Sequence, residues 1–91
     1  MTDRLHALER LRELLSLFHV ANDADDHWSS AEATEIRQRA IKGIRDLLAE
    51  HPFVIAIFPT LESELETAHQ RDISWSIWMA VEREIRGKSH R

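Results

Sequence analysis

The chain has 91 residues, a net charge of −4 and no cysteine, which indicates a single domain without disulfides, zinc–thiolate sites or a cysteine nucleophile. With 43% hydrophobic and 31% charged residues it has the composition of a folded protein, and its acidic balance disfavours general nucleic-acid binding, which needs clustered lysine and arginine. No apolar stretch approaches the roughly 20 residues that cross a bilayer, and the charged N-terminus lacks the apolar core of a signal peptide, so we expect a cytoplasmic protein.

The first predicted helix spans about residues 3–21. Its apolar residues recur at spacings of three and four, which is typical of one buried helix face: Leu8, Leu11, Leu15 and Phe18. The acidic segment 22–26 then ends the helix, because Asn and Asp side chains compete for local backbone hydrogen bonds. This segment does not fit a calcium loop, since Trp28 and Thr34 stand where the glycine and the bidentate glutamate belong.

The second predicted helix spans about residues 29–50. Ser29 and Glu32 have the spacing of a capping box, which marks the start of a helix. One face of the helix is apolar: Ile36, Ala40, Ile44 and Leu47. Gly43 lies at the margin of this face. A glycine inside a helix costs about 1 kcal/mol relative to alanine, so its presence predicts a closely packed neighbouring helix.

Residues 53–58 form an unbroken apolar run between the only two prolines, Pro52 and Pro59, and the predicted element spans about residues 52–58. Because the run has no polar face, we expect it to be buried on all sides at the centre of the fold or of an interface. The β-branched residues would suit a strand, but the chain offers no second strand to pair with it. We therefore favour a short helix with Pro52 in its first turn. A strand would have to pair with its own copy across a dimer axis.

The last predicted helices span about residues 60–70 and 72–87, with Gly87 as the stop signal. One apolar stripe carries Leu61 and Leu65 and, if the helix is unbroken, continues into Trp75 and Met79. A second stripe of Ile77, Trp78, Val81 and Ile85 lies about 150° away at about 100° per residue. Either the helix breaks near residues 70–72, with Asp72 as the new cap, or one continuous helix is sandwiched between the core and a partner. In both cases Trp75 and Met79 fall off the second stripe, so Trp75 either faces a partner or packs over a neighbouring loop.

Six histidines make a metal site worth considering. Glu66 and His69 form a Glu-x-x-His pair, and Glu62 lies one turn earlier on the same side. Di-iron helical bundles use this pair twice, whereas here it occurs once, so a second copy of the chain would have to complete the site. His19 and His27 flank the acidic segment, where we expect histidines at the edge of a loop rather than ligands.

The sequence offers no convincing catalytic set. None of its serines lies in a glycine-flanked nucleophile elbow, and two glycines are too few for a phosphate-binding loop. A helix-turn-helix DNA reader needs a basic second helix, but acidic residues balance the basic ones in 29–50, as in the pair Glu35–Arg39. We therefore predict a protein without enzymatic activity and without a cofactor.

These observations predict an all-α fold, a bundle of four to five helices completed or extended by homodimerisation. The function predicted from them is a protein–protein interaction module, such as an adaptor, inhibitor or immunity-type protein. Its predicted contact face consists of Trp75, Met79, Leu61 and Leu65. The alternative is a dimeric metal-binding bundle using Glu62, Glu66 and His69. A weaker alternative is a DNA-binding regulator.

Overall fold

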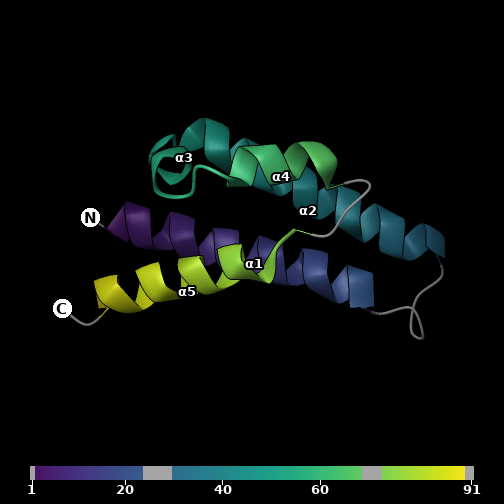
Figure 1. Ribbon diagram of the computed structural model, residues 1–91, viewed down its shortest axis with the longest axis horizontal. Helices are drawn as coiled ribbons and strands as arrows, with labels where there is room; N and C mark the ends of the chain where they lie inside the picture. Colours follow the sequence, from purple (N-terminus) through teal and green to yellow (C-terminus); the bar gives the residue numbers. More distant parts are fainter. Residues whose placement is uncertain (1, 24–29, 69–72, 90–91) are drawn as a thin grey trace.

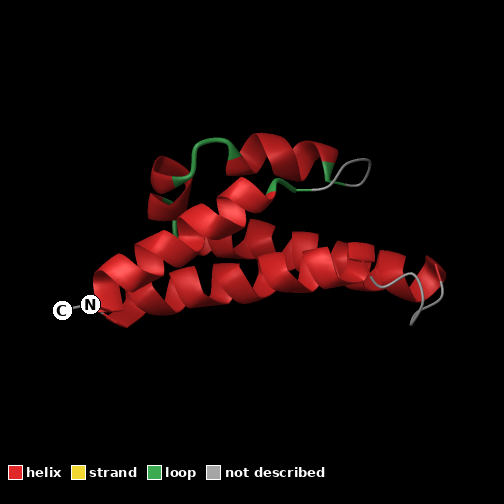
Figure 2. Cartoon of the chain, turned by 60° about the horizontal axis from the view of Figure 1, so that its bottom comes forward, coloured by secondary structure: helices red, strands yellow, loops and turns green. Residues whose placement is uncertain are grey.

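The computed structural model describes residues 2–23, 30–68 and 73–89, and these ranges form five helices joined by short connections, without a strand (Figures 1 and 2). The helices are α1 (Thr2–Asp23), α2 (Ser30–Glu50), α3 (Phe53–Ile57), α4 (Leu61–Thr67) and α5 (Trp75–Ser89). The particle is elongated, measuring 42 × 23 × 19 Å. The predicted all-α bundle is therefore confirmed for the described residues. None of their helices is long and apolar enough to span a membrane.

The two longest helices, α1 and α2, lie side by side and antiparallel (Figure 1). The predicted stripe of α1 is fully buried, and Ala40, Ile44 and Leu47 meet it from α2. Gly43 lies against Leu14, because a Cβ atom built on this glycine would come within 2.8 Å of the Leu14 Cδ2 atom. The close helix contact predicted from Gly43 is confirmed. Of the predicted capping box, the structure describes the side chain of Glu32 but not that of Ser29. The side chains of the acidic segment 22–26 also lie outside the described ones.

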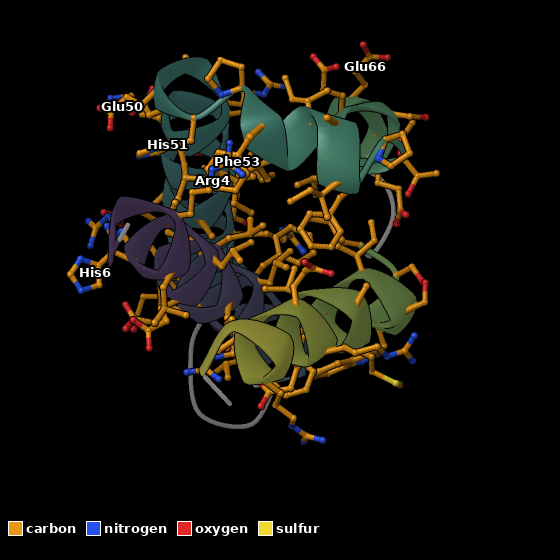
Figure 3. All side chains as sticks on the ribbon, turned by 90° about the vertical axis from the view of Figure 1, so that its left-hand side faces the viewer. Arg4, His6, Glu50, His51, Phe53 and Glu66 are labelled. Carbon is orange, nitrogen blue, oxygen red and sulfur yellow. The ribbon has the colours of Figure 1, made fainter. Side chains whose placement is uncertain are left out.

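The predicted helix over 52–58 is present as α3, but the predicted burial of its apolar run at the centre of the fold is wrong. Val54 and Phe58 are buried, whereas Ala56 is exposed and the other apolar residues of α3 are partly covered. The helix lies at the end of the bundle near the N-terminus (Figure 1). There the Arg4 guanidinium lies 4.9 Å from the centre of the Phe53 ring, which is a cation–π contact between α1 and α3. Figure 3 labels both residues. A short helix at the end of a bundle has neighbours on one side only, which leaves the rest of the run open to solvent.

The break between the last two helices is real, because Ile73 and Ser74 are not helical and α5 begins at Trp75. The reading of one continuous sandwiched helix is therefore wrong. The Ser74 hydroxyl accepts a hydrogen bond from the Ser76 backbone N–H at 3.1 Å, so Ser74 is the cap of α5. Asp72, the predicted cap, lies outside the described residues, and the helix starts three residues later than predicted. The Glu64 carboxylate accepts the Ser74 backbone N–H at 2.6 Å and so joins α4 to the start of α5.

Helix α5 packs antiparallel against α1 (Figure 1). Ile77, Val81 and Ile85 are buried in the core, as the second stripe predicted. Gly87 does not end the helix, which continues to Ser89, and its backbone has no positive φ. Gly87 is exposed and has no atom near its missing Cβ, so nothing in the tertiary structure forces a turn at this position.

Candidate functional site

The contact line between α1 and α5 carries polar and aromatic pairs in a regular antiparallel register. The Arg12 guanidinium donates to the Glu82 carboxylate at 2.8 Å, and the Trp78 indole N–H donates to the Ser16 hydroxyl at 2.9 Å. At the next position along, the His19 and Trp75 rings stack with centroids 3.9 Å apart and planes 12° apart. Each step up α1 matches an equal step down α5. The register of the two helices therefore fixes the side chains along their shared surface.

Trp75 is only half covered by this packing. One face of its ring rests on His19, and its edge meets Trp78 with centroids 5.8 Å apart at 71°. Even so, 47% of Trp75 is exposed, and Met79, one turn further along α5, is 56% exposed. Both residues therefore lie off the buried stripe of α5, as their helical phase predicted. Trp75 packs on helix α1, which holds its other face in a fixed position. The loop residues 24–29 and 69–72, which the alternative reading concerns, lie outside the described residues.

Leu61 and Leu65 do not belong to the exposed face. They are 0% and 3% exposed and form the contact of α4 with the core. They share a helical phase with Trp75 only if α4 continues into α5, and the break at Ile73–Ser74 removes that relation. The predicted contact face must therefore be redrawn without the two leucines. We define the α5 face by its exposed residues at four-residue spacing: Trp75, Met79 and Arg83.

The residues that position Trp75 escaped the sequence analysis. His19 was predicted as a histidine at the edge of a loop, but it is 2% exposed and also touches the Phe18 ring edge-on at 5.9 Å. The sequence signal for its burial was its spacing: His19 follows Leu15 by four residues and so lies at the border of the buried stripe of α1. The partnership of Trp78 with Ser16 had no such signal, because it depends on which helix packs beside α1.

The alternative metal site gains no support from the described residues. Glu62 and Glu66 are exposed on α4, while His69 lies outside the described part of the chain. Among the side chains that the structure does describe, no group of three histidines or carboxylates is close enough to hold a metal ion. His27, the other histidine beside the acidic segment 22–26, likewise lies outside the described residues.

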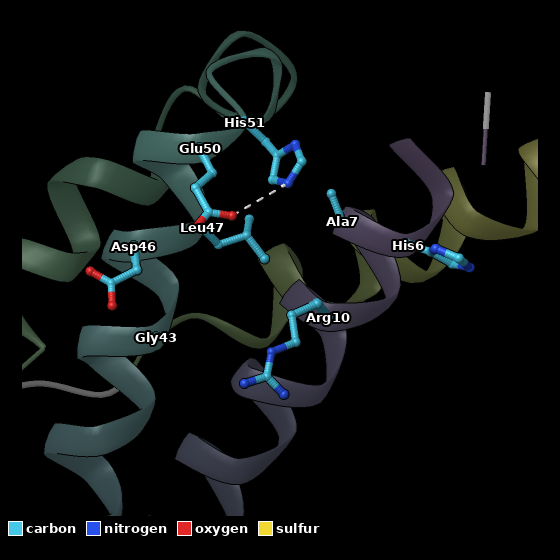
Figure 4. Close-up of a pocket in the computed structure, with 8 residues that line it drawn as sticks. All are labelled: His6, Ala7, Arg10, Gly43, Asp46, Leu47, Glu50 and His51. Carbon is cyan, nitrogen blue, oxygen red and sulfur yellow. Dashed lines mark ion pairs between the residues drawn. The ribbon is translucent and has the colours of Figure 1, made fainter. Parts of the chain in front are cut away.

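A hollow of about 370 Å³ between the start of α1 and the end of α2 gathers several titratable side chains (Figure 4). Arg10 and Asp46 lie on opposite walls, and His51 approaches its neighbour Glu50 at 4.0 Å. His6 belongs to the lining, but its ring points away from His51 (Figure 4). The two imidazoles therefore do not meet at one point, as a shared proton-transfer site would require.

The solvent face of α2 carries the balanced charges that the sequence predicted. The Arg39 guanidinium lies 3.1 Å from the Glu35 carboxylate, and both side chains are exposed. Each such pair lowers the positive potential that a DNA-reading helix needs.

Comparison of the chain with protein-family models, with curated proteins and with solved structures gives no match. The surfaces just described are therefore the basis on which a function is assigned.

Proposed function

We propose that this protein is a non-enzymatic protein–protein interaction module whose α5 face binds a second copy of the same chain. The observation that carries the proposal is the exposure of Trp75 and Met79, one turn apart, on a helix locked to α1 by the Trp75–His19 stack. Tryptophan, methionine and arginine are enriched in protein interfaces. A side chain whose position is fixed before binding loses less entropy when a partner covers it.

The order of residues along the α5 face favours a second copy as the partner. Trp75 and Arg83 lie four residues on either side of Met79. In a two-fold symmetric dimer the same patch is used on both chains. If the axis passes near Met79 and the helices run antiparallel, Trp75 of each copy faces Arg83 of the other, which is a favourable cation–π pair. A parallel arrangement would instead place Arg83 opposite Arg83, and like charges in an interface are costly.

The expected association is weak. Full burial of one large apolar side chain contributes about 1.5–3 kcal/mol, and roughly half of that remains to be gained for Trp75 and for Met79. Interfaces that bury less than about 1,200 Å² in total belong to transient complexes, and a dimer centred on one helix of 15 residues lies in this class. The dimer should therefore form at high protein concentration and dissociate on dilution.

Sedimentation equilibrium over a wide concentration range tests the proposal. The average mass of the wild-type protein should rise above the 10.6 kDa of one chain as the concentration approaches about 1 mM, where an association worth about 4 kcal/mol is half-maximal. Met79→Glu should remain at the mass of one chain, because it places two carboxylates at the symmetry axis. Leu17→Glu is the matched control, since Leu17 is also an exposed apolar residue but lies on α1, about 100° around the helix from Ser16.

Two results would contradict the proposal. One is a wild-type protein that keeps the mass of one chain throughout the concentration range. The other is a dimer that Leu17→Glu disrupts as strongly as Met79→Glu does, because its interface would then not be the α5 face.

A further inference from the structure

A second surface, on the side of the bundle away from α5, has the features of a peptide-binding groove. Two adjoining hollows of about 380 and 350 Å³ lie between α2 and α4 and share Arg45 and Leu65 in their linings. On α2 the linings reach from Gln38 to Ala49, which corresponds to about 16 Å of helix at 1.5 Å per residue. Helix α4 contacts the start of α5 through Glu64, but Glu66 lies on the side of α4 that points away from α5 (Figure 3).

The floor of the groove is apolar and its two walls carry opposite charges. Ile41 and Ile55, which are both partly buried, contribute the apolar surface of the linings, whereas Leu65 is only 3% exposed. Lys42 and Arg45 line it from α2, and Glu62 and Glu66 line it from α4. In the described part of the chain no ion pair connects the two walls. The positive wall and the negative wall therefore both keep their charge available to a ligand.

We propose that this α2–α4 groove binds an amphipathic helix of a partner protein that has acidic residues along one flank and basic residues along the other. The apolar stripe of such a helix would lie on Ile41 and Ile55, as in other helix-in-groove complexes. Its acidic flank would face Lys42 and Arg45, and its basic flank would face Glu62 and Glu66. A small molecule suits this surface less well, because small-molecule sites enclose most of their ligand whereas this groove is long and open.

The groove is independent of the proposed dimer. It shares no residue with the α5 face, so either surface can fail its test without affecting the other. Helix binding at the groove would give the module a surface for a different protein while α5 contacts a second copy.

The test uses three synthetic helical peptides of about four turns with the same leucine stripe. One has a glutamate flank and a lysine flank, the second has two glutamate flanks, and the third has two lysine flanks. Fluorescence anisotropy of the labelled peptides should show the mixed peptide binding about three- to tenfold more tightly than either uniform peptide, because each uniform peptide places like charges against one wall. The titration is repeated with the Met79→Glu variant, in which the affinities should be unchanged.

Variants of the α2 wall provide the decisive comparison. Arg45→Glu leaves Lys42 and a new glutamate on the α2 wall, a net charge of zero, so the mixed peptide should lose its advantage over the peptide with two lysine flanks. Arg10→Glu makes the same change in charge on α1, outside the groove, and should leave the order of the three peptides unchanged. Circular dichroism verifies that both variants remain folded. Each of three results would overturn the proposal: no peptide binds, the mixed peptide keeps its advantage in Arg45→Glu, or it loses this advantage equally in Arg10→Glu. Light scattering tests one further outcome. If adding a peptide converts a dimer of the protein into single chains, the peptide competes with a second copy for the groove, and the proposal is wrong.

Discussion

Helix α1 contacts its two long neighbours in different ways. Towards α2 it presents leucines. Because Gly43 has no side chain, the two helices come so close that Leu14 occupies the space where a Cβ atom of residue 43 would lie. Towards α5 its outer edge presents Arg12, Ser16 and His19, each with a specific partner. The first contact is apolar and closely packed, whereas the second is polar and aromatic at its edge. We therefore expect the apolar α1–α2 contact to contribute more to stability than the polar edge of the α1–α5 contact, which fixes the register that places Trp75.

The largest expected effect comes from removing a buried side chain in the α1–α2 contact. Ile44 is fully buried, so Ile44→Ala should lower the free energy of unfolding by about 2–5 kcal/mol in a urea titration. Ile36→Ala is the control in the same helix. Ile36 is only partly buried, and its truncation should cost clearly less. Equal losses at the two positions would show that the α1–α2 contact is not centred where the structure places it.

The close approach at Gly43 predicts a difference between the two glycines. Gly87→Ala should stabilise the protein by up to about 1 kcal/mol, because Gly87 is in a helix and has free space around it. Gly43→Ala should not give this gain, since the new methyl group would lie 2.8 Å from the Leu14 Cδ2 atom. In a Leu14→Ala background the gain should return, which corresponds to a coupling of about 1 kcal/mol in a double-mutant cycle. Additive effects would rule out the contact.

These positions also show what the sequence could reveal and where its information ended. The helices were predictable because their apolar periodicity is local, and Gly43 indicated a close neighbour.

The burial of 52–58 was predicted wrongly, because an apolar run does not reveal that its helix lies at the end of the bundle. The exposure of Trp75 and Met79 followed from their phase. Leu61 and Leu65 were wrongly added because their relation to α5 depends on residues 68–74. The partnership of His19 with Trp75 depends on helix register, which no local pattern encodes.

At the α1–α5 edge, one hydrogen bond can be tested by changing either of its partners. Trp78→Phe eliminates the donor to the Ser16 hydroxyl, and we expect a loss of about 1 kcal/mol in the free energy of unfolding. Ser16→Ala removes the other partner. The double variant should cost less than the sum of the two single variants, because the same bond is lost in each. A coupling of zero would mean that the bond contributes nothing to the register.

The smallest expected effect concerns the ion pair Arg12–Glu82. Its side chains are 33% and 20% exposed, so solvent screens much of the attraction, and we expect a coupling of no more than about 1 kcal/mol that weakens with added salt. The control pair Arg10–Glu13, at 3.7 Å and more than 60% exposed, should show less. If the coupling of Arg12 with Glu82 does not exceed that of the control pair, this contact adds nothing to the α1–α5 edge.

The proposed antiparallel dimer can be tested by disulfide trapping, because the natural chain has no cysteine. Met79→Cys places one thiol of each copy at the symmetry axis, so mild oxidation should rapidly produce a covalent dimer. Arg83→Cys should not, since two such residues would be offset by about 12 Å along the helix axis. A disulfide requires Cα atoms within about 7 Å. Selective crosslinking through Met79→Cys is the result that we predict, and equal or faster crosslinking through Arg83→Cys would contradict the dimer.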